Sequence, residues 1–356
     1  MIGQVGYAIR QGSKMYNEDA VQAVTLLGQH STAPAYVHLL IVADGHGYDG
    51  HGKLCADFCV AAATNWMKGF LSVEMNWETF DWKFAATGLT EQMHETFREV
   101  LCNAAPNRTI VEPYNVVCAT DGFREAIHSG STFSMTITFP VGDKFRTIPI
   151  QVGDSDIYIN GVRVNCDHTP LNVEEYRRIQ KLPEEIRGSL LFDTKGLNDH
   201  IFMEDGNYNP KFYNPMWPRA PWRWSKELTP NCAKYTPGTY LVSSNLYPTK
   251  LACTRSIGDF YAHVHGVTHE PYVGDAIDTE TCPHITVASD GAFDTIDAND
   301  QWVFLNKRVF PVHISIDEQN SVMDVVTERV DILYELYVEK FGAKHVDDIS
   351  MCVLHP

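Results

Sequence analysis

Five stretches of the chain carry the hydrophobic patterns of β-strands. The run YVHLLIVA at 36–43 is apolar almost throughout and predicts a buried strand, whereas STFSMTITF at 131–139 alternates apolar and polar positions. The segment TIPIQVGDSDIYING at 147–161 predicts two strands joined at a Gly-Asp turn. HITVASDG at 284–291 and DDISMCVLHP at 347–356 each predict one further strand.

Other stretches repeat their apolar residues with helical spacing. At 53–70 the large apolar residues recur at every fourth position, which predicts an amphipathic helix. At 90–105 a second helix is expected, with Thr90 as its N-cap and with Met93, Phe97 and Leu101 on one buried stripe. The segment at 321–341 predicts a long third helix.

The segment 181–250 has a different character. It is rich in Pro, Trp, Asn and Tyr and has weak periodicity, so we expect a loop-rich insertion within a single domain spanning 1–356. Trp217, Trp222 and Trp224 could form a peptide-docking surface, but a local mini-core for the insertion is favoured. Strands with helices grouped between them predict the α+β class.

Composition narrows the range of functions. Across 356 residues, 28 Lys and Arg oppose 45 Asp and Glu, which gives a formal net charge of −17 and argues against nucleic acid or an anionic membrane as partner. Nine Cys occur without a CxxC pair, the N-terminus is too polar for a signal peptide, and no run approaches the roughly 18 apolar residues of a membrane span. We therefore expect an intracellular monomer with free thiols, cytoplasmic or nuclear.

Acids gather where the predicted strands begin or end. Asp44, Asp154 and Asp290 follow apolar strands beside a Gly, Asp347 precedes the last strand, and Glu18 lies in an early YNEDA segment. Strand ends can converge on one rim, and carboxylates there suit the hard cations Mg²⁺ or Mn²⁺. Asp-Gly is also a common turn, so the pattern alone leaves a metal site and a set of polar turns equally open.

Seven short motifs occur in one order: NED at 17–19, VADGHG at 42–47, GST at 130–132, VGDS at 152–155, RSIGD at 255–259, ASDGAFD at 288–294 and DDIS at 347–350. This set, from about residue 10 to the end, resembles the metal-dependent PP2C-type (PPM) Ser/Thr protein phosphatases. The resemblance implies a four-layer α-β-β-α sandwich, two antiparallel sheets flanked by helices, with 181–250 as a flap-like insertion. It also implies that phosphoserine and phosphothreonine in a protein substrate are hydrolysed by water activated between two Mg²⁺ or Mn²⁺ ions.

The resemblance implies a role for each matching residue. Asp44 would bridge the two ions, with the Gly45 carbonyl and Glu18 on one and with Asp290 and Asp347 on the other. The remaining roles are a third-ion site at Asp154 and Asp294 together with Asp290, an acid near the ions at Asp19, and a general acid at His46.

Four positions depart from the family pattern. Lys14 stands where the family has a phosphate-binding Arg, which removes the bidentate fork, and Arg10 is the alternative cation. Tyr48 replaces a Gly, so the local loop is expected to differ. Asp156 replaces an Arg, and Asp348 replaces an Asn, so it can accept hydrogen bonds but cannot donate as an amide does.

Three interpretations therefore stay open: an active protein phosphatase, which is favoured, a catalytically weak or silent regulatory module of the same fold, and a phosphatase of small molecules. Several other residues are expected to be structural. Core or surface histidines, rather than a metal cluster, are expected at His51, His263, His265 and His269. Core packing is expected for Cys55 and Cys59, ion pairing for Arg255, and loop orientation for Asp259.

Overall fold

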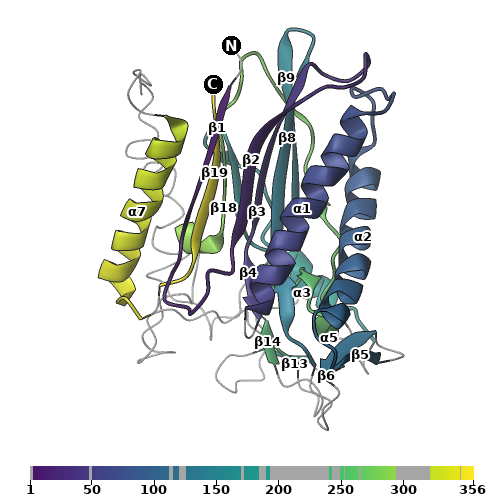
Figure 1. The fold of residues 1–356 in the computed structure, drawn as a ribbon, viewed down its shortest axis with the longest axis vertical. Coiled ribbons are helices and arrows are strands. Elements are labelled where there is room, and N and C mark those ends of the chain that lie inside the picture. Colours follow the sequence, from purple (N-terminus) through teal and green to yellow (C-terminus); the bar gives the residue numbers. More distant parts are fainter. Residues whose placement is uncertain are drawn as a thin grey trace.

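Two antiparallel β-sheets lie face to face in the middle of the computed structural model, with helices on both outer sides (Figure 1). The structure describes residues 3–47, 50–111, 115–119, 126–169, 172–183, 190–192, 240–242, 249–251, 253–263, 266–293, 321–344 and 346–356. The predicted fold class, an α+β sandwich in four layers, is confirmed.

The two large sheets are built from strands distant in sequence. The five-stranded sheet has the order β1 (Gln4–Arg10), β19 (Ile349–His355), β18 (Ile285–Ala288), β10 (Asp156–Ile159) and β11 (Val162–Arg163). The six-stranded sheet comprises β16 (Tyr272–Val273), β9 (Lys144–Val152), β8 (Phe133–Val141), β3 (Tyr36–Ala43) and β2 (Ala20–Leu27), with β17 (Ile277–Thr279) also paired to β9.

Three smaller sheets lie outside this sandwich. One has the order β15 (Ile257–Gly258), β7 (Ser129–Ser131) and β4 (Gly45–Gly47), and it extends directly from the end of β3. The second pairs β5 (Arg108–Val111) with β6 (Val116–Ala119). The third joins β12 (Leu190–Phe192), β13 (Tyr240–Val242) and β14 (Thr249–Leu251).

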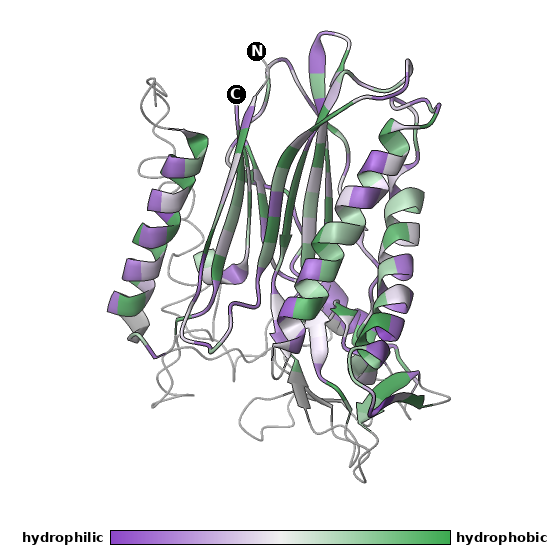
Figure 2. Cartoon of the chain, viewed as in Figure 1, coloured by the Kyte–Doolittle hydropathy of each residue, from purple (hydrophilic) through white to green (hydrophobic). Residues whose placement is uncertain are grey.

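The long helices form the outer layers. Helices α1 (His51–Leu71) and α2 (Trp82–Asn103) cover the six-stranded sheet, and α7 (Val322–Phe341) covers the five-stranded sheet (Figure 1). The shorter helices are α3 (Val173–Gln180), α5 (Phe260–His263) and the 3₁₀ turn η2 (Asp290–Ala292). Strands in the middle of Figure 2 are largely hydrophobic, whereas α1, α2 and α7 mix hydrophobic and hydrophilic positions, as helices with one buried face do.

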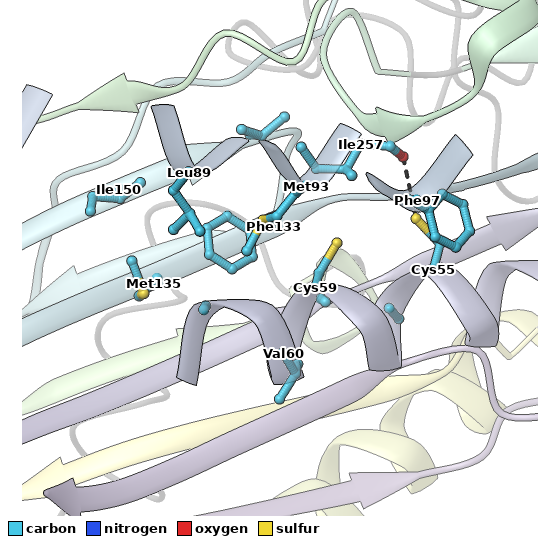
Figure 3. Packing of buried hydrophobic residues seen from close by; sticks show 14 of the residues in the cluster. Cys55, Cys59, Val60, Leu89, Met93, Phe97, Phe133, Met135, Ile150 and Ile257 are labelled. Atoms are coloured by element: carbon cyan, nitrogen blue, oxygen red, sulfur yellow. Dashed lines mark hydrogen bonds between the residues drawn. The ribbon is translucent and has the colours of Figure 1, made fainter. Parts of the chain in front are cut away.

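Three hydrophobic clusters fill the three interfaces between the four layers. On β3, Leu39 and Ile41 pack toward α1 and α2, where Figure 3 shows the side chains of that cluster. Leu40 and Val42 point the other way, into the cluster between the two sheets. Because β3 is buried on both faces, its sequence is apolar without alternation. Cys55 and Cys59 are buried in the helix-side cluster, as expected.

The expected start of the second helix was wrong. Helix α2 begins at Trp82, where the Asp81 carboxylate accepts a hydrogen bond from the Phe84 backbone N–H at 2.9 Å. Thr90 lies inside the helix, and its hydroxyl donates to the Thr87 carbonyl at 3.2 Å. The first two turns were missed because exposed residues such as Phe84 interrupt the apolar spacing there.

The predicted insertion at 181–250 lies largely outside the described residues, as do Trp217, Trp222 and Trp224. Its described portions include β12 and β13. Among the helices that the structure describes, none is long and apolar enough to cross a membrane.

Candidate metal centre and active site

The acids predicted at strand ends come together at one end of the sandwich. Asp44 directly follows β3, Asp290 opens the turn after β18, and Asp347 precedes β19. Glu18 and Asp19 immediately precede β2, which pairs along the whole length of β3. Four segments far apart in sequence therefore supply carboxylates to one place.

The electrostatics of Asp44 reflect this crowding. Burial raises the pKa of its carboxyl well above the usual value, and the nearby charges of Asp19, Asp290 and Asp347 raise it further. Burial likewise raises the pKa of Asp19 to about 7, together with the charges of Asp348 and Asp347. Acids arranged in this way repel one another unless a cation offsets their charge.

Asp19 gives a second sign that a cation fits. Both carboxylate oxygens are buried and accept no hydrogen bond of normal geometry from the described residues, although the Ser289 and Ser350 hydroxyls lie near them. Buried oxygens of this kind need a partner. The donor set consists of carboxylates and backbone carbonyls, which suits Mg²⁺ or Mn²⁺ rather than a softer ion.

Lys14 is the cation that reaches these acids. Its Nζ lies 3.3 Å from Glu18 Oε2 and 3.2 Å from Asp347 Oδ1. Burial opposes its charge, but Asp347, Asp44 and Glu18 together raise the pKa of Lys14 above its usual value. Arg10, the alternative, is engaged elsewhere: its guanidinium pairs with Asp331 of α7 at 2.9 Å.

The backbone around Asp44 is fixed by its neighbours. The Asp44 N–H donates to Thr132 Oγ1 at 3.1 Å, and the Thr132 N–H donates to the Asp44 carbonyl at 2.9 Å. A Cβ at Gly45 would overlap the carbonyl oxygens of Gly52 and Glu18. Only glycine fits at position 45, so the DGHG motif is needed for this close approach. The GST motif supplies Thr132. The clamp by Thr132 was not foreseen from the sequence.

His46 has a carboxylate partner that the sequence analysis missed. Its Nε2 lies 2.5 Å from Oδ2 of Asp259, a residue only 1% exposed. Although burial opposes a charged ring, Asp259 raises the pKa of His46 above its usual value. Asp259 was expected only to orient its loop. The trace of this contact in the sequence is the glycine at position 130. In the structure a Cβ there would clash with the Asp259 carboxylate.

The backbone of Asp259 is itself constrained. Its φ of 46° lies in the left-handed region, which is uncommon for a residue other than glycine. The Asp259 N–H donates to the Ser129 carbonyl at 2.8 Å, which ties the loop to β7. Strained backbone of this kind is often found at functional sites.

Two of the departures from the family pattern have structural explanations. Asp348 accepts from the Gly12 N–H at 2.7 Å on Oδ1 and from the Glu18 N–H at 2.8 Å on Oδ2. An amide has only one acceptor oxygen and could not accept both bonds in this way. Asp156 is buried against Arg163 at 2.5 Å, so its charge is neutralised by that guanidinium.

The remaining predicted residues divide into two groups. Asp154 lies near the centre, because its charge acts on the pKa of His46. Asp294 and Tyr48 lie outside the described residues. Arg255 forms an ion pair with the buried Glu175 at 2.6 Å, as expected for a structural residue.

The described histidines contact different partners. His51 Nε2 lies 2.6 Å from an Arg108 guanidinium nitrogen, away from the others. His263 and His269 gather with His94 of α2, which the sequence analysis did not connect with them. His263 and His269 are partly buried, and their grouping with His94, a residue distant in the chain, was not predicted. His265 lies outside the described residues.

Comparisons with known proteins concern the family and the fold. The family model described as Protein phosphatase 2C matches residues 10–309, so Asp347 lies beyond the matched range. A solved sex-determining protein from C. elegans is similar at 15% identity and a TM-score of 0.56, covering 100% of this chain but only 65% of that one. The serine-threonine phosphatase 2C from Toxoplasma gondii is similar at 13% identity and a TM-score of 0.57, covering 99% of this chain and 94% of that one. A comparison with curated proteins gives no match.

Proposed function

Because the chain belongs to the protein phosphatase 2C family, we propose that it is a metal-dependent phosphoprotein phosphatase acting on phosphoserine and phosphothreonine. The observation that carries this proposal is the crowding of Asp44 by Asp19, Asp290 and Asp347 in a buried position, with Lys14 alongside.

The acids have the role of holding two Mg²⁺ or Mn²⁺ ions. Asp44, the Gly45 carbonyl, Glu18, Asp290 and Asp347 would hold these ions. Asp19 supports the pair, and Asp154 with Asp294 would hold a weaker third ion. When bound, these cations supply a polarised water as nucleophile and offset the charge of the phosphate.

The other residues bind and protonate the substrate. The ammonium group of Lys14 binds a phosphate oxygen as a point charge. His46 keeps Nε2 against Asp259, which leaves Nδ1 as the nitrogen that gives a proton to the departing Ser or Thr oxygen. Asp259 acts through His46 as a positioning residue and keeps its ring protonated.

The test is phosphate release from p-nitrophenyl phosphate and from a phosphothreonine peptide with Mn²⁺. EDTA should abolish turnover, and Asp290→Asn should lower it by at least about 100-fold, whereas Asp143→Asn in the exposed 141–144 turn serves as the matched control. Activity that is absent in the unmodified protein, or that survives both EDTA and Asp290→Asn, would refute the proposal.

A regulatory module that is catalytically weak or silent is the second candidate, and the position of Lys14 favours it. Its ammonium group contacts two of the proposed metal ligands and could neutralise them in place of an ion. Calorimetry with Mn²⁺ separates the two candidates. Two-site binding by the unmodified chain supports the enzyme, whereas binding that appears only after Lys14→Met supports the silent module.

The insertion at 181–250 is proposed to select substrates. Deleting residues 205–228 should change the preference among phosphopeptides more than it changes turnover of p-nitrophenyl phosphate. Equal loss on both substrates, measured side by side with melting temperature, would assign this segment to folding instead.

A further inference from the structure

Three histidines meet beside α2, outside the acid cluster. His94 belongs to α2, His263 ends α5, and His269 follows shortly after α5. One ligand atom from each ring lies within 4.8 Å of those of the other two. The His94 ring centroid is 4.1 Å from that of His263 and 4.5 Å from that of His269.

The hydrogen bonds of the described residues do not use all the ring nitrogens of this cluster. The Nε2–H of a neutral His263 donates to the Ser256 carbonyl at 3.1 Å, which leaves Nδ1 as an acceptor. The Nδ1 atoms of His94 and His269 are buried and have no hydrogen-bond partner among the described residues. A buried polar nitrogen without a partner is unfavourable, so the arrangement calls for an explanation.

The rings are neutral and their surroundings are acidic. Burial lowers the pKa of His263 to about 3 and lowers those of His94 and His269 as well. Arg98 is the cation nearby, and its guanidinium is paired with Glu95. The carboxylates that act on the cluster are Glu91, Glu95 and Glu270 beside His269, and Asp259 beside His263. Among the described residues whose charges act on the three imidazoles, the acids outnumber the cation Arg98.

We propose that His94, His263 and His269 form a second metal site, for a divalent transition-metal ion of the zinc type. Imidazole nitrogen suits Zn²⁺, whereas the acid cluster offers the oxygen ligands that Mg²⁺ and Mn²⁺ prefer. Three nitrogens leave the fourth tetrahedral position to water. The Ser256 carbonyl would fix the orientation and tautomer of His263 from behind.

Binding requires the rings to turn. With bonds of about 2.0–2.1 Å, nitrogens on one tetrahedral ion lie roughly 3.4 Å apart, closer than the widest spacing present. The ring planes of His94 and His269 are now nearly parallel, 22° apart, so their lone pairs must rotate toward a common point. His269 is only partly buried and comes from a loop, which gives it the freedom to do so.

The site can be tested without measuring phosphatase activity. Full-length Asp290→Asn protein, stripped of metal, is titrated with Co²⁺ while the visible absorption of tetrahedral cobalt is recorded, and Zn²⁺ is then added. One equivalent of Co²⁺ should produce the band, one equivalent of Zn²⁺ should remove it, and excess Mg²⁺ should leave it unchanged.

Variants identify the ligands. His269→Ala and His94→Gln, each in the same Asp290→Asn background, should weaken Zn²⁺ binding by about 100-fold or more, since even an outer partner of a ligand is worth 10–100-fold. His30→Ala changes a partly exposed histidine elsewhere and should bind as the parent does. Circular dichroism checks that each variant is folded. If His94→Gln is not folded, the test rests on His269→Ala, because His269 is only partly buried.

Two results would overturn the site: absence of the tetrahedral band in the parent, or Zn²⁺ binding by His269→Ala that equals that of the parent. In that case the three rings are a packed stack of neutral aromatic groups. Neither result bears on the proposed phosphatase, because the acid cluster is disabled throughout this experiment.

Discussion

At the scale of single residues, the Asp259 carboxylate determines how readily the His46 ring keeps its proton. It does so through one contact of 2.5 Å from a position that is almost entirely buried. A negative charge held this close stabilises the imidazolium and opposes the effect of burial on the ring.

Asp259→Asn should therefore shift the pH dependence of turnover. Removing the charge lowers the pKa of His46, so the protonated fraction at a given pH falls. If His46 is the proton donor, the basic limb of kcat moves to lower pH, and kcat at pH 8 falls by roughly ten- to a hundredfold. The measurement is a pH–rate profile on a phosphothreonine peptide. A uniform loss at every pH, without movement of the limb, would indicate a purely structural role.

Lys14 offers a second residue-scale prediction. Lys14→Met should raise KM for a phosphopeptide by about tenfold or more, because a charge-assisted hydrogen bond to phosphate is worth about 1.5–3 kcal/mol. Lys14→Arg should restore binding, since its guanidinium fork matches a phosphate. Lys68→Met, on an exposed position of α1, provides the control. An unchanged KM in Lys14→Met would remove Lys14 from the substrate site.

At the scale of elements, Glu175 joins α3 to the loop that precedes β15. It accepts from Arg255 at 2.6 Å, from Arg178 at 2.9 Å and from the Thr254 hydroxyl at 2.7 Å. Burial opposes its charge, but these partners lower the pKa of Glu175 to about 2. The charged form is thus favoured by folding.

Glu175→Gln should lower the free energy of unfolding at pH 7 by about 3 kcal/mol, and the loss should depend on pH. The folded pKa lies below the unfolded value of 4.5. The contribution is therefore complete above about pH 4.5 and disappears as pH falls toward 2.

Urea unfolding at pH 7 and pH 3 measures the contribution of Glu175. Glu174→Gln, its exposed neighbour on the same helix, should change stability by less than about 0.5 kcal/mol. An equal effect of both substitutions would contradict this account.

Elements differed in how well the sequence predicted them. Strand β3 was predictable because both of its faces are buried, and α7 because its apolar spacing is regular. The start of α2 was missed where the exposed Phe84 breaks the pattern. The contact between His46 and Asp259 could not be predicted from pattern at all, because it depends on β7 pairing with both β4 and β15. Strand pairing of this kind is set by long-range packing rather than by local propensity.

At the scale of the whole molecule, the four layers bury separate clusters on the two faces of β3. Leu40→Ala, facing the second sheet, should lower the free energy of unfolding by about 2–5 kcal/mol, and Leu39→Ala, facing the helices, by a similar amount. Leu27→Ala is the control, because Leu27 is 71% exposed and should cost less than about 0.5 kcal/mol. A mild effect of Leu40→Ala would mean that the two sheets are not tightly packed together.

The position of β19 has a consequence for biosynthesis. This strand lies between β1 and β18, so among the described strands the partner of β1 is not available until residues 349–355 have been translated. The same segment brings Asp347 and Asp348, which complete the acid cluster and hold the Gly12 loop. Strands β2, β3, β8 and β9 and helices α1 and α2 precede it and can pair earlier on the ribosome. A nascent or prematurely terminated chain that lacks residues 347–355 would thus carry the six-stranded sheet and its helices without a complete acid cluster.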